Sequence, residues 1–534
     1  MDVHSDSSVG ESPTPHQRPI SSGDNIILER ERNARIALYR QELWEAKLVI
    51  EAVAHHHLGL TSGATCRVTE RTQWLGERFN VCIPIDIDEK GAKSPWKVLF
   101  KCPIPVALGE DKYPGAVDEK IRAEVGSHVY MRAHCPEIPL PELYGFGFPN
   151  GNQFTHVSQL AVIGRFSPKF WHFFEILVSG ALNGQLIAPY AYDDCFHKLP
   201  SGYLLVEYID DSKGQPLANT WGEEADNLGL QNNLHQGIAK LMLSLASLPQ
   251  ERIGSYWFND DLTVTLLGRP LICAQTLMEA NGAGRIMPST GTHSLTSSFI
   301  SDMLDLHNNR FVSHVNSVSS VEDCYNQMGI MALLRTVAHL FINRDVRNGS
   351  FCLQLPELDL THIFVDSEWN ITHIVDLEWM ASLPVEMLQE PHWLTGLFVA
   401  EDDGQYTTDE ARGMFMEVFA HYEQIMGDNM RLPVSPRKIM NEMWNSKGIW
   451  LYNSLMSADG MYDDVNLVLL PRFASIMAPE LKKIVAPFWA EDVESIVAIK
   501  VAHREQYVAD VTAIFRHMAG QGGGAGNTPD SSSD

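Results

Sequence analysis

The spacing of apolar residues in this chain changes near residue 210, and this change sets the fold class. Before it, apolar and polar residues alternate in CRVTERTQWLG (66–76), RFNVCIPIDIDEKG (78–91) and WKVLFKCPIP (96–105). Alternation indicates strands, whereas the later stripe Leu234, Ile238, Leu241 and Leu245 has the period of a helix. The sequence therefore predicts an α+β chain with an antiparallel sheet first and a mainly helical second part.

The same patterns divide the chain into five segments. Both ends are rich in Ser, Gly, Pro and Asp, which predicts disordered tails. The helical part is expected to be interrupted once, by two short strands within IFVDSEWNITHIVDLEW (363–379). The predicted segments are a tail (1–25), a helical lead-in (26–65), a sheet unit (66–209), a helical unit (210–518) and a second tail (519–534).

Composition excludes several classes of protein. With 40 Lys and Arg against 67 Asp and Glu, the net charge of −27 opposes nucleic-acid binding. No window approaches the ~18 apolar residues of a membrane helix, and the polar, acidic start does not resemble a signal peptide. The eight cysteines stand singly, which is typical of reduced thiols. We therefore expect a cytoplasmic protein with no membrane or nucleic-acid partner.

Consecutive histidines occur once, at His55, His56 and His57. On a helix, successive side chains point about 100° apart, so these three cannot share one metal ion. We expect them to lie at the surface.

A glycine turn and two charged residues could form a phosphate-binding site. Gly76 lies between two predicted strands, where backbone N–H groups could cover a phosphate, although a plain hairpin turn also explains it. Lys101 lies inside an apolar strand, and a buried cation needs an anionic partner. Glu124, on a helix predicted over 118–135, is the candidate partner. The alternative is a surface lysine and a solvated glutamate.

A further carboxylate, Asp376, follows the apolar stretch THIV (372–375). An aspartate at the end of a short buried strand is well placed to bind a divalent metal together with nucleotide phosphates. A helix N-cap is the alternative explanation.

The order of these features resembles the aminoglycoside phosphotransferase family of kinase-like proteins, especially its large fungal branch. The resemblance covers about residues 66–400 and is most specific in the segment 363–391, which contains IFVDSEWNITHIVDLEWMASLPVEM. Four other stretches also resemble sequences of that branch: KCPIPVALGE (101–110), DEKIRAEV (118–125), CPEIPLPELYGFG (135–147) and IGSYWFNDDLTVTLLGRPL (253–271).

The resemblance implies a two-lobed protein-kinase-like fold that transfers the γ-phosphoryl group of ATP to a hydroxyl group of a small molecule. It implies ATP at a hinge near Glu207 and Tyr208, Lys101 and Glu124 at the phosphates, and Mg²⁺ at Asp376. It also implies an acceptor site against the helical region after residue 384.

The chain departs from the family in the catalytic segment, which we place at 351–379. The family pattern T-D-L-H-x-S-N-I-F-V-D reads PELDLTHIFVD here (356–366). Glu357 occupies the position of the family's catalytic aspartate, and His362 occupies that of the metal-binding asparagine. Asp359 occupies the position of the family's histidine. Glu357 keeps a carboxylate on a longer side chain, whereas imidazole is a poor Mg²⁺ ligand. Asp359 could partly substitute as the base. However, the family places a metal ligand five positions after the base, and the residue five positions after Asp359 cannot bind a metal.

Two hypotheses follow. The first is an active phosphotransferase with Glu357 as an atypical base, for which the acidic charge favours an amine-bearing acceptor. The second is a pseudokinase, in which the fold persists, transfer is lost and the chain binds a nucleotide or a protein partner.

Overall fold

The computed structural model describes residues 25–89, 95–161, 185–193, 199, 201–395, 405–427, 431–458, 461–473 and 479–522. The predicted N-terminal tail lies outside these residues except for Asn25, which caps the first helix. The last helix continues to Gly522, so the first residues of the predicted C-terminal tail are helical and the rest lie outside the described residues.

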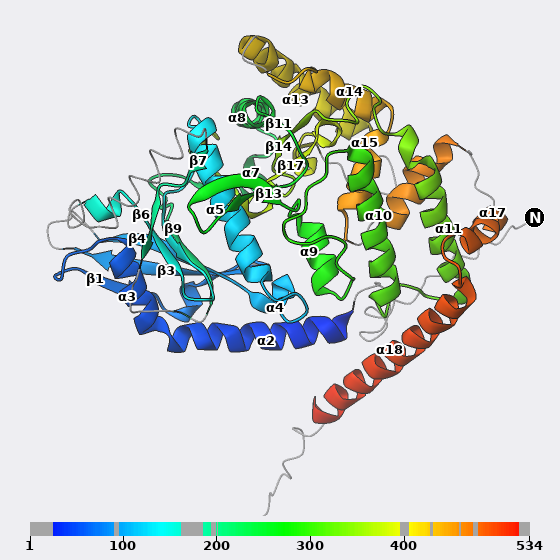
Figure 1. Ribbon diagram of the computed structural model, residues 1–534, viewed down its shortest axis with the longest axis horizontal. Helices are drawn as coiled ribbons and strands as arrows, with labels where there is room; N and C mark the ends of the chain where they lie inside the picture. Colours follow the sequence, from blue (N-terminus) through cyan, green and yellow to red (C-terminus); the bar gives the residue numbers. More distant parts are fainter. Residues whose placement is uncertain are drawn as a thin grey trace, which may run out of the picture.

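An eight-stranded antiparallel sheet forms the N-terminal part (Figure 1). Its order is β1, β3, β4, β9, β5, β6 and β8, and β2 pairs with β3. The strands are β1 (Thr65–Val68), β2 (Leu75–Gly76), β3 (Asn80–Asp88), β4 (Trp96–Pro103), β5 (Leu143–Gly147), β6 (Gln153–His156), β8 (Tyr190–Asp193) and β9 (Tyr203–Glu207). The predicted antiparallel sheet is confirmed.

The stretch 66–76 is two short strands rather than one. A 3₁₀ turn, η1 (Arg71–Gln73), separates them, and the Trp74 indole donates a hydrogen bond to the Thr69 carbonyl at 3.1 Å. The polar run before Trp74 has no apolar face to place on the sheet, so the chain turns there instead of extending.

Strand β4 places different residues on its two faces. Val98 and Phe100 are fully buried in the core, while Leu99 and Lys101 lie on the opposite face because side chains alternate along a strand. Leu99 pairs with Val206 of β9, and Lys101 pairs with Leu204. The central strands thus present an apolar surface that carries one lysine.

Three helices pack against this sheet. Helices α2 (Ile26–Glu45) and α3 (Lys47–His57) run beside it, and α5 (Ala116–His134) lies between it and the helical part (Figure 1). Helix α5 contacts β12 (Ser255–Phe258). A Cβ atom at Gly126 would lie 2.8 Å from the backbone of Tyr256, so glycine permits this close approach.

His57 is buried, which corrects the expected surface position. Ile50, Val53, Ala54 and His57 share the buried face of α3. The His57 ring lies 2.7 Å from the Thr155 hydroxyl and 2.8 Å from the Tyr203 hydroxyl. Burial lowers the pKa of His57 to about 4, so the imidazole is a neutral member of the core.

The second part contains more strands than the predicted single pair. Strand pairing here is again antiparallel. The three small sheets are β10 (Gln215–Pro216), β15 (Ile363–Val365) and β16 (Ile371–Ile374); β11 (Pro249–Gln250), β14 (Phe351–Gln354) and β17 (Ala381–Pro384); and β12, β13 (Thr263–Gly268) and β7 (Leu186–Ile187). These strands are too short for their alternation to stand out in the sequence.

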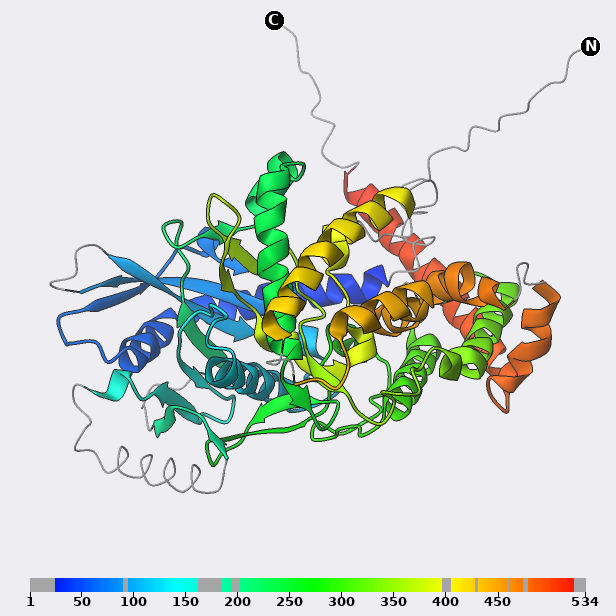
Figure 2. The same cartoon turned by 90° about the horizontal axis from the view of Figure 1, so that it is seen from above.

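Helices dominate the remainder, and the later ones, from α14 (Pro436–Asn445) on, lie at the end away from the large sheet (Figure 1 and Figure 2). They are α7 (Ala218–Glu224), α8 (Leu228–Ala246), α9 (Cys273–Ala280), α10 (Thr296–Ser313), α11 (Val321–Val337), α12 (His392–Thr395), α13 (Gln405–Met426), α14 (Pro436–Asn445), α15 (Gly448–Met456), α16 (Met461–Asp464), α17 (Pro479–Val485) and α18 (Val493–Gly522), with α4 (Pro105–Leu108) near the sheet. One large apolar core spans both parts. Within the described ranges, no helix is long and apolar enough to cross a bilayer.

Candidate functional site

A cavity of about 770 Å³ lies between the large sheet and the segment that contains β15 and β16. The site residues predicted from the sequence all line it, although they come from five separate stretches of the chain. They are Gly76, Lys101, Glu124, Glu207, Tyr208, Glu357, Asp359, His362 and Asp376.

Lys101 is buried and surrounded by carboxylates. Its ammonium lies 3.0 Å from Glu124 Oε1 and 3.3 Å from Glu378 Oε2, and it also contacts Asp376. The predicted Lys101–Glu124 pair is therefore present, and the surface-lysine alternative is wrong. Burial acts to lower the pKa of Lys101, but Asp376 and Glu124 outweigh it and raise the pKa well above the usual lysine value.

A second buried lysine at this site was not predicted from the sequence. Lys120 Nζ lies 3.0 Å from Glu124 Oε2 and 2.6 Å from Glu378 Oε2. Burial acts to raise the pKa of Glu378, but Lys120 and Lys101 hold it well below its ordinary value. Two signals could have identified these residues: Lys120 precedes Glu124 by one helical turn, and Glu378 follows Asp376 by two positions.

Asp376 lies just past the end of β16, with backbone φ 60° and ψ 67°. This left-handed conformation is uncommon for a residue with a side chain, but aspartate tolerates it better than most. Asp376 precedes the 3₁₀ turn η4 (Leu377–Trp379), yet its side chain makes no capping hydrogen bond to that turn. Asp376 thus occupies the N-cap position without capping the turn through its side chain, and it lines the cavity.

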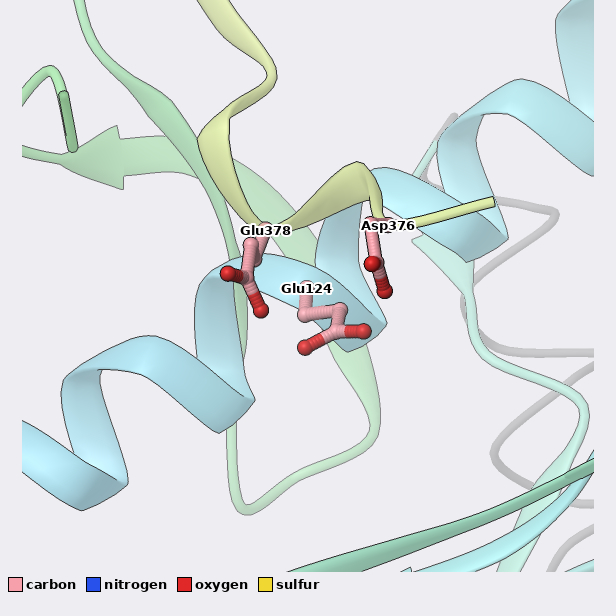
Figure 3. Close-up of side chains that lie close together, drawn as sticks. All are labelled: Glu124, Asp376 and Glu378. Carbon is pink, nitrogen blue, oxygen red and sulfur yellow. The ribbon is translucent and has the colours of Figure 1, made fainter. Parts of the chain in front are cut away.

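Three carboxylates converge at this point (Figure 3). Glu124 projects from α5, while Asp376 and Glu378 project from the segment after β16. One oxygen from each lies within 4.8 Å of the others. Oxygen donors at this spacing fit a hard divalent cation such as Mg²⁺, which would share the carboxylates with Lys101 and Lys120.

The turn after Gly76 is a closed hairpin. The Glu77 N–H donates to the Asn80 carbonyl at 3.1 Å, so this N–H serves the turn and does not face a ligand. The Asn80 amide donates to Glu77 at 2.9 Å and to Glu378 at 3.0 Å. The Phe79 ring packs edge-on against Trp379 at 4.8 Å. These contacts hold the hairpin against the carboxylate cluster.

Glu357 lies where this cavity meets a second one, of about 980 Å³, and lines both. Its carboxylate interacts with the Cys273 thiol. Burial raises the pKa of Glu357, and nearby His362 and Arg78 offset part of that effect. A carboxylate with a raised pKa is a better proton acceptor than an ordinary glutamate. Arg78 was not predicted from the sequence.

His362 and Asp359 both make contacts within the catalytic segment. His362 Nδ1 lies 2.9 Å from the Glu357 carbonyl, which it contacts as a donor, and Nε2 lies 3.6 Å from Asp376 Oδ2. Asp359 Oδ1 accepts hydrogen bonds from the Thr361 N–H at 2.7 Å and its hydroxyl at 2.6 Å. Asp359 therefore holds a local turn.

Glu207 and Tyr208 lie at the end of β9. Glu207 accepts hydrogen bonds from Lys213 at 2.5 Å and from the Glu142 N–H at 3.1 Å. Burial acts to raise the pKa of Glu207, but these two donors lower it below its ordinary value. The Glu207 carboxylate thus pairs with protein groups at the edge of the cavity.

Comparison with known proteins adds no relatives. The chain matches no protein-family model, and no curated protein has a significantly similar sequence.

Proposed function

We propose that this chain is an ATP-dependent phosphotransferase with a kinase-like arrangement of two lobes, acting on a hydroxyl group of a small molecule. One observation carries the proposal: a single cavity holds the buried Lys101–Glu124 pair and Asp376, and it ends at Glu357, where a second cavity begins. Apolar packing needs none of these charges, and burying them is costly even when they are paired, so their meeting in a cavity favours a functional role.

The lining of the first cavity suits a nucleotide. Leu99, Leu143 and Val206 provide an apolar wall on the central strands for a purine ring. Lys101 and Arg78 provide positive charge for phosphate groups. The purine would lie near the end of β9 and the phosphates near the carboxylate cluster.

Asp376, with Glu124 and Glu378, would hold the divalent cation. Mg²⁺, when bound there, supplies positive charge that neutralises the phosphate oxygens. Lys101 and Lys120 hold these carboxylates in place, because each ammonium contacts two or more of them.

Glu357 would accept the proton of the acceptor hydroxyl. The acceptor oxygen bonds to the γ-phosphorus while the bond from that phosphorus to the β,γ-bridging oxygen breaks, so ADP leaves with the electron pair. The acceptor would occupy the second cavity, which is lined in part by residues 387–392 and 450–467. We also propose a cytoplasmic location, supported by the seven unpaired cysteines among the described residues.

A catalytically inactive nucleotide-binding protein is the second candidate. The observation that favours it is the direct contact of Lys101 with Asp376, together with an imidazole in place of an oxygen ligand at His362. Both features weaken the hold on Mg²⁺. Turnover separates the two candidates, because both predict nucleotide binding.

Thermal unfolding with and without Mg²⁺–ATP tests nucleotide binding. Ligand at about 100 times its Kd adds about 2.7 kcal/mol of stability, so the wild type should unfold at a temperature at least about one degree higher. Asp376→Asn, which is nearly isosteric, and Lys101→Ala should lose this shift. Lys240→Ala, an exposed lysine on α8, is the control and should keep it.

ADP release in the same samples tests catalysis. Release above the level of Lys101→Ala supports the phosphotransferase. A nucleotide-induced shift without ADP release, in the presence of a broad set of hydroxyl compounds, supports the inactive candidate. The absence of any shift in a folded wild-type protein would rule out both.

A further inference from the structure

We infer that the acceptor is a hydroxyl compound with an apolar, uncharged body, and is neither a polycation nor an anion; this inference rests on the proposed function. It comes from the second cavity, whose volume of about 980 Å³ is that of a complete small-molecule site. Glu357 is the residue that this cavity shares with the nucleotide cavity, so a hydroxyl placed beside Glu357 belongs to a molecule whose remainder fills the second cavity.

Aliphatic and thioether side chains form a large part of the wall of this cavity. Helix α8 contributes Leu241, Met242 and Leu245, and α15 contributes Trp450 and Met456. Such a surface gains free energy when it covers apolar area, about 25 cal/mol for each Å² removed from water. Its aliphatic and thioether side chains offer no hydrogen bonds to the hydroxyl or ammonium groups of a ligand.

The charges of the lining argue against an anionic acceptor. Among the described residues that line the cavity there is no lysine or arginine, and burial lowers the pKa of His392, the histidine among them. The acidic residues are Glu357, Glu390 and Asp464. An anion here would face carboxylates without a counter-charge.

The same charges argue against a polycation. Glu390 is buried and forms an ion pair with Arg412 at 2.8 Å, so its charge is already balanced. Asp464 also has a partner within the protein. Glu357 remains, and the proposed reaction needs it as a proton acceptor. A ligand with several ammonium groups would therefore bury them without partners, at a cost of several kcal/mol each.

Neutral polar side chains also line the cavity, among them two amides that contact each other. Gln389 donates a hydrogen bond to Asn453 Oδ1 at 2.7 Å, and both residues line the cavity. This bond uses the Gln389 N–H and the Asn453 carbonyl, so the Gln389 carbonyl and the Asn453 amino group are the atoms suited to a ligand hydroxyl or carbonyl. A few neutral polar groups in an apolar wall orient an uncharged ligand without selecting for charge.

The experiment compares probes that differ in charge. The apolar alcohols are 2-naphthaleneethanol, geraniol and 4-phenyl-1-butanol; kanamycin is the polycation and glycerol 3-phosphate the anion. Each is added to the full chain with Mg²⁺ and ATP, and thermal unfolding and ADP release are recorded. We expect at least one apolar alcohol to raise the unfolding temperature and to increase ADP release at least tenfold, and the two charged probes to do neither.

A pair of variants locates the binding. Leu467 lines the second cavity and is 57% exposed, so replacing it should leave the fold intact. Leu467→Arg places a cation in the apolar wall and should weaken binding of the apolar alcohols at least tenfold. Leu467→Met, the matched control, should bind them as the wild type does. Neither variant should change the shift caused by Mg²⁺–ATP.

The outcomes separate this inference from the proposed function. Stabilisation or phosphorylation of kanamycin or glycerol 3-phosphate, without any effect of the apolar alcohols, overturns the inference even if ATP binds. No effect of any probe also overturns it. Binding of an apolar alcohol that is weakened by Leu467→Arg, without a shift from Mg²⁺–ATP, supports an apolar ligand site and removes the phosphotransferase.

Discussion

The Lys120 ammonium lies 2.6 Å from the Glu378 carboxylate, although these residues belong to segments more than 250 positions apart. Lys120 also contacts Glu124 one turn further along α5, and Glu378 also contacts Lys101. The four residues form a closed network in which each charge has two opposite neighbours. Such a network holds the four side chains together by charge pairing between distant segments.

Loss of Lys120 should destabilise the fold. Lys120→Met leaves Glu378 and Glu124 with one ammonium between them, and breaking a buried ion pair in this way costs about 3–5 kcal/mol. Urea unfolding should show the loss as a lower midpoint with an unchanged slope. The double variant Lys120→Met/Glu378→Gln should recover at least half of the loss. Equal, additive losses would show that the two residues are not coupled.

Replacement of Glu357 should separate binding from turnover. Glu357→Gln removes the proton acceptor but keeps the shape of the side chain, so ADP release in the presence of an acceptor should fall by about 10² or more. The thermal shift with Mg²⁺–ATP should stay. Glu368→Gln, an exposed carboxylate in the same segment, is the control and should behave as the wild type. Wild-type turnover in Glu357→Gln would remove the residue from the reaction.

The preferred metal should depend on His362. Because Nδ1 donates to the Glu357 carbonyl, Nε2 is directed toward Asp376. An imidazole nitrogen suits Mn²⁺ better than Mg²⁺. We expect Mn²⁺ to support a larger ATP-induced thermal shift than Mg²⁺ in the wild type, and His362→Asn to reverse this order. The same Mn²⁺ to Mg²⁺ ratio in both proteins would show that His362 does not reach the metal.

The stability of the chain should fall as pH rises toward neutrality, through Glu386. This buried carboxyl accepts a hydrogen bond from the Asn343 N–H at 2.6 Å, and burial raises its pKa from 4.5 to about 7. The folded state therefore holds a proton that the unfolded state releases. The stabilisation is complete below pH 4.5 and is lost as pH rises through 7, by about 3 kcal/mol at most.

Glu386→Gln, which carries no titratable proton, isolates this contribution. Urea unfolding at pH 5 and pH 8 should show that the wild type loses about 2–3 kcal/mol more than the variant between these values. Parallel losses in the two proteins would mean that Glu386 does not titrate in this range.

The sequence by itself determined the local elements and part of the site. Alternation in 78–91 and 96–105 predicted β3 and β4, and the helical stripe in 118–135 predicted α5. It also predicted the Lys101–Glu124 pair, because a lysine in an apolar strand requires a carboxylate nearby. These features depend on residues a few positions apart or on the cost of an unpaired charge. Both can be recognised from the amino-acid sequence alone.

The tertiary structure decided what no local pattern contains. The burial of His57, the contact of Lys120 with Glu378 and the position of Glu357 between two cavities all depend on how distant segments pack. The sequence shows whether a side chain is charged or apolar. It does not show which partner side chain lies within about 3 Å once the chain has packed. Ion pairing and burial are short-ranged, so the meeting of distant segments, and with it the chemistry of the site, was settled only by the fold.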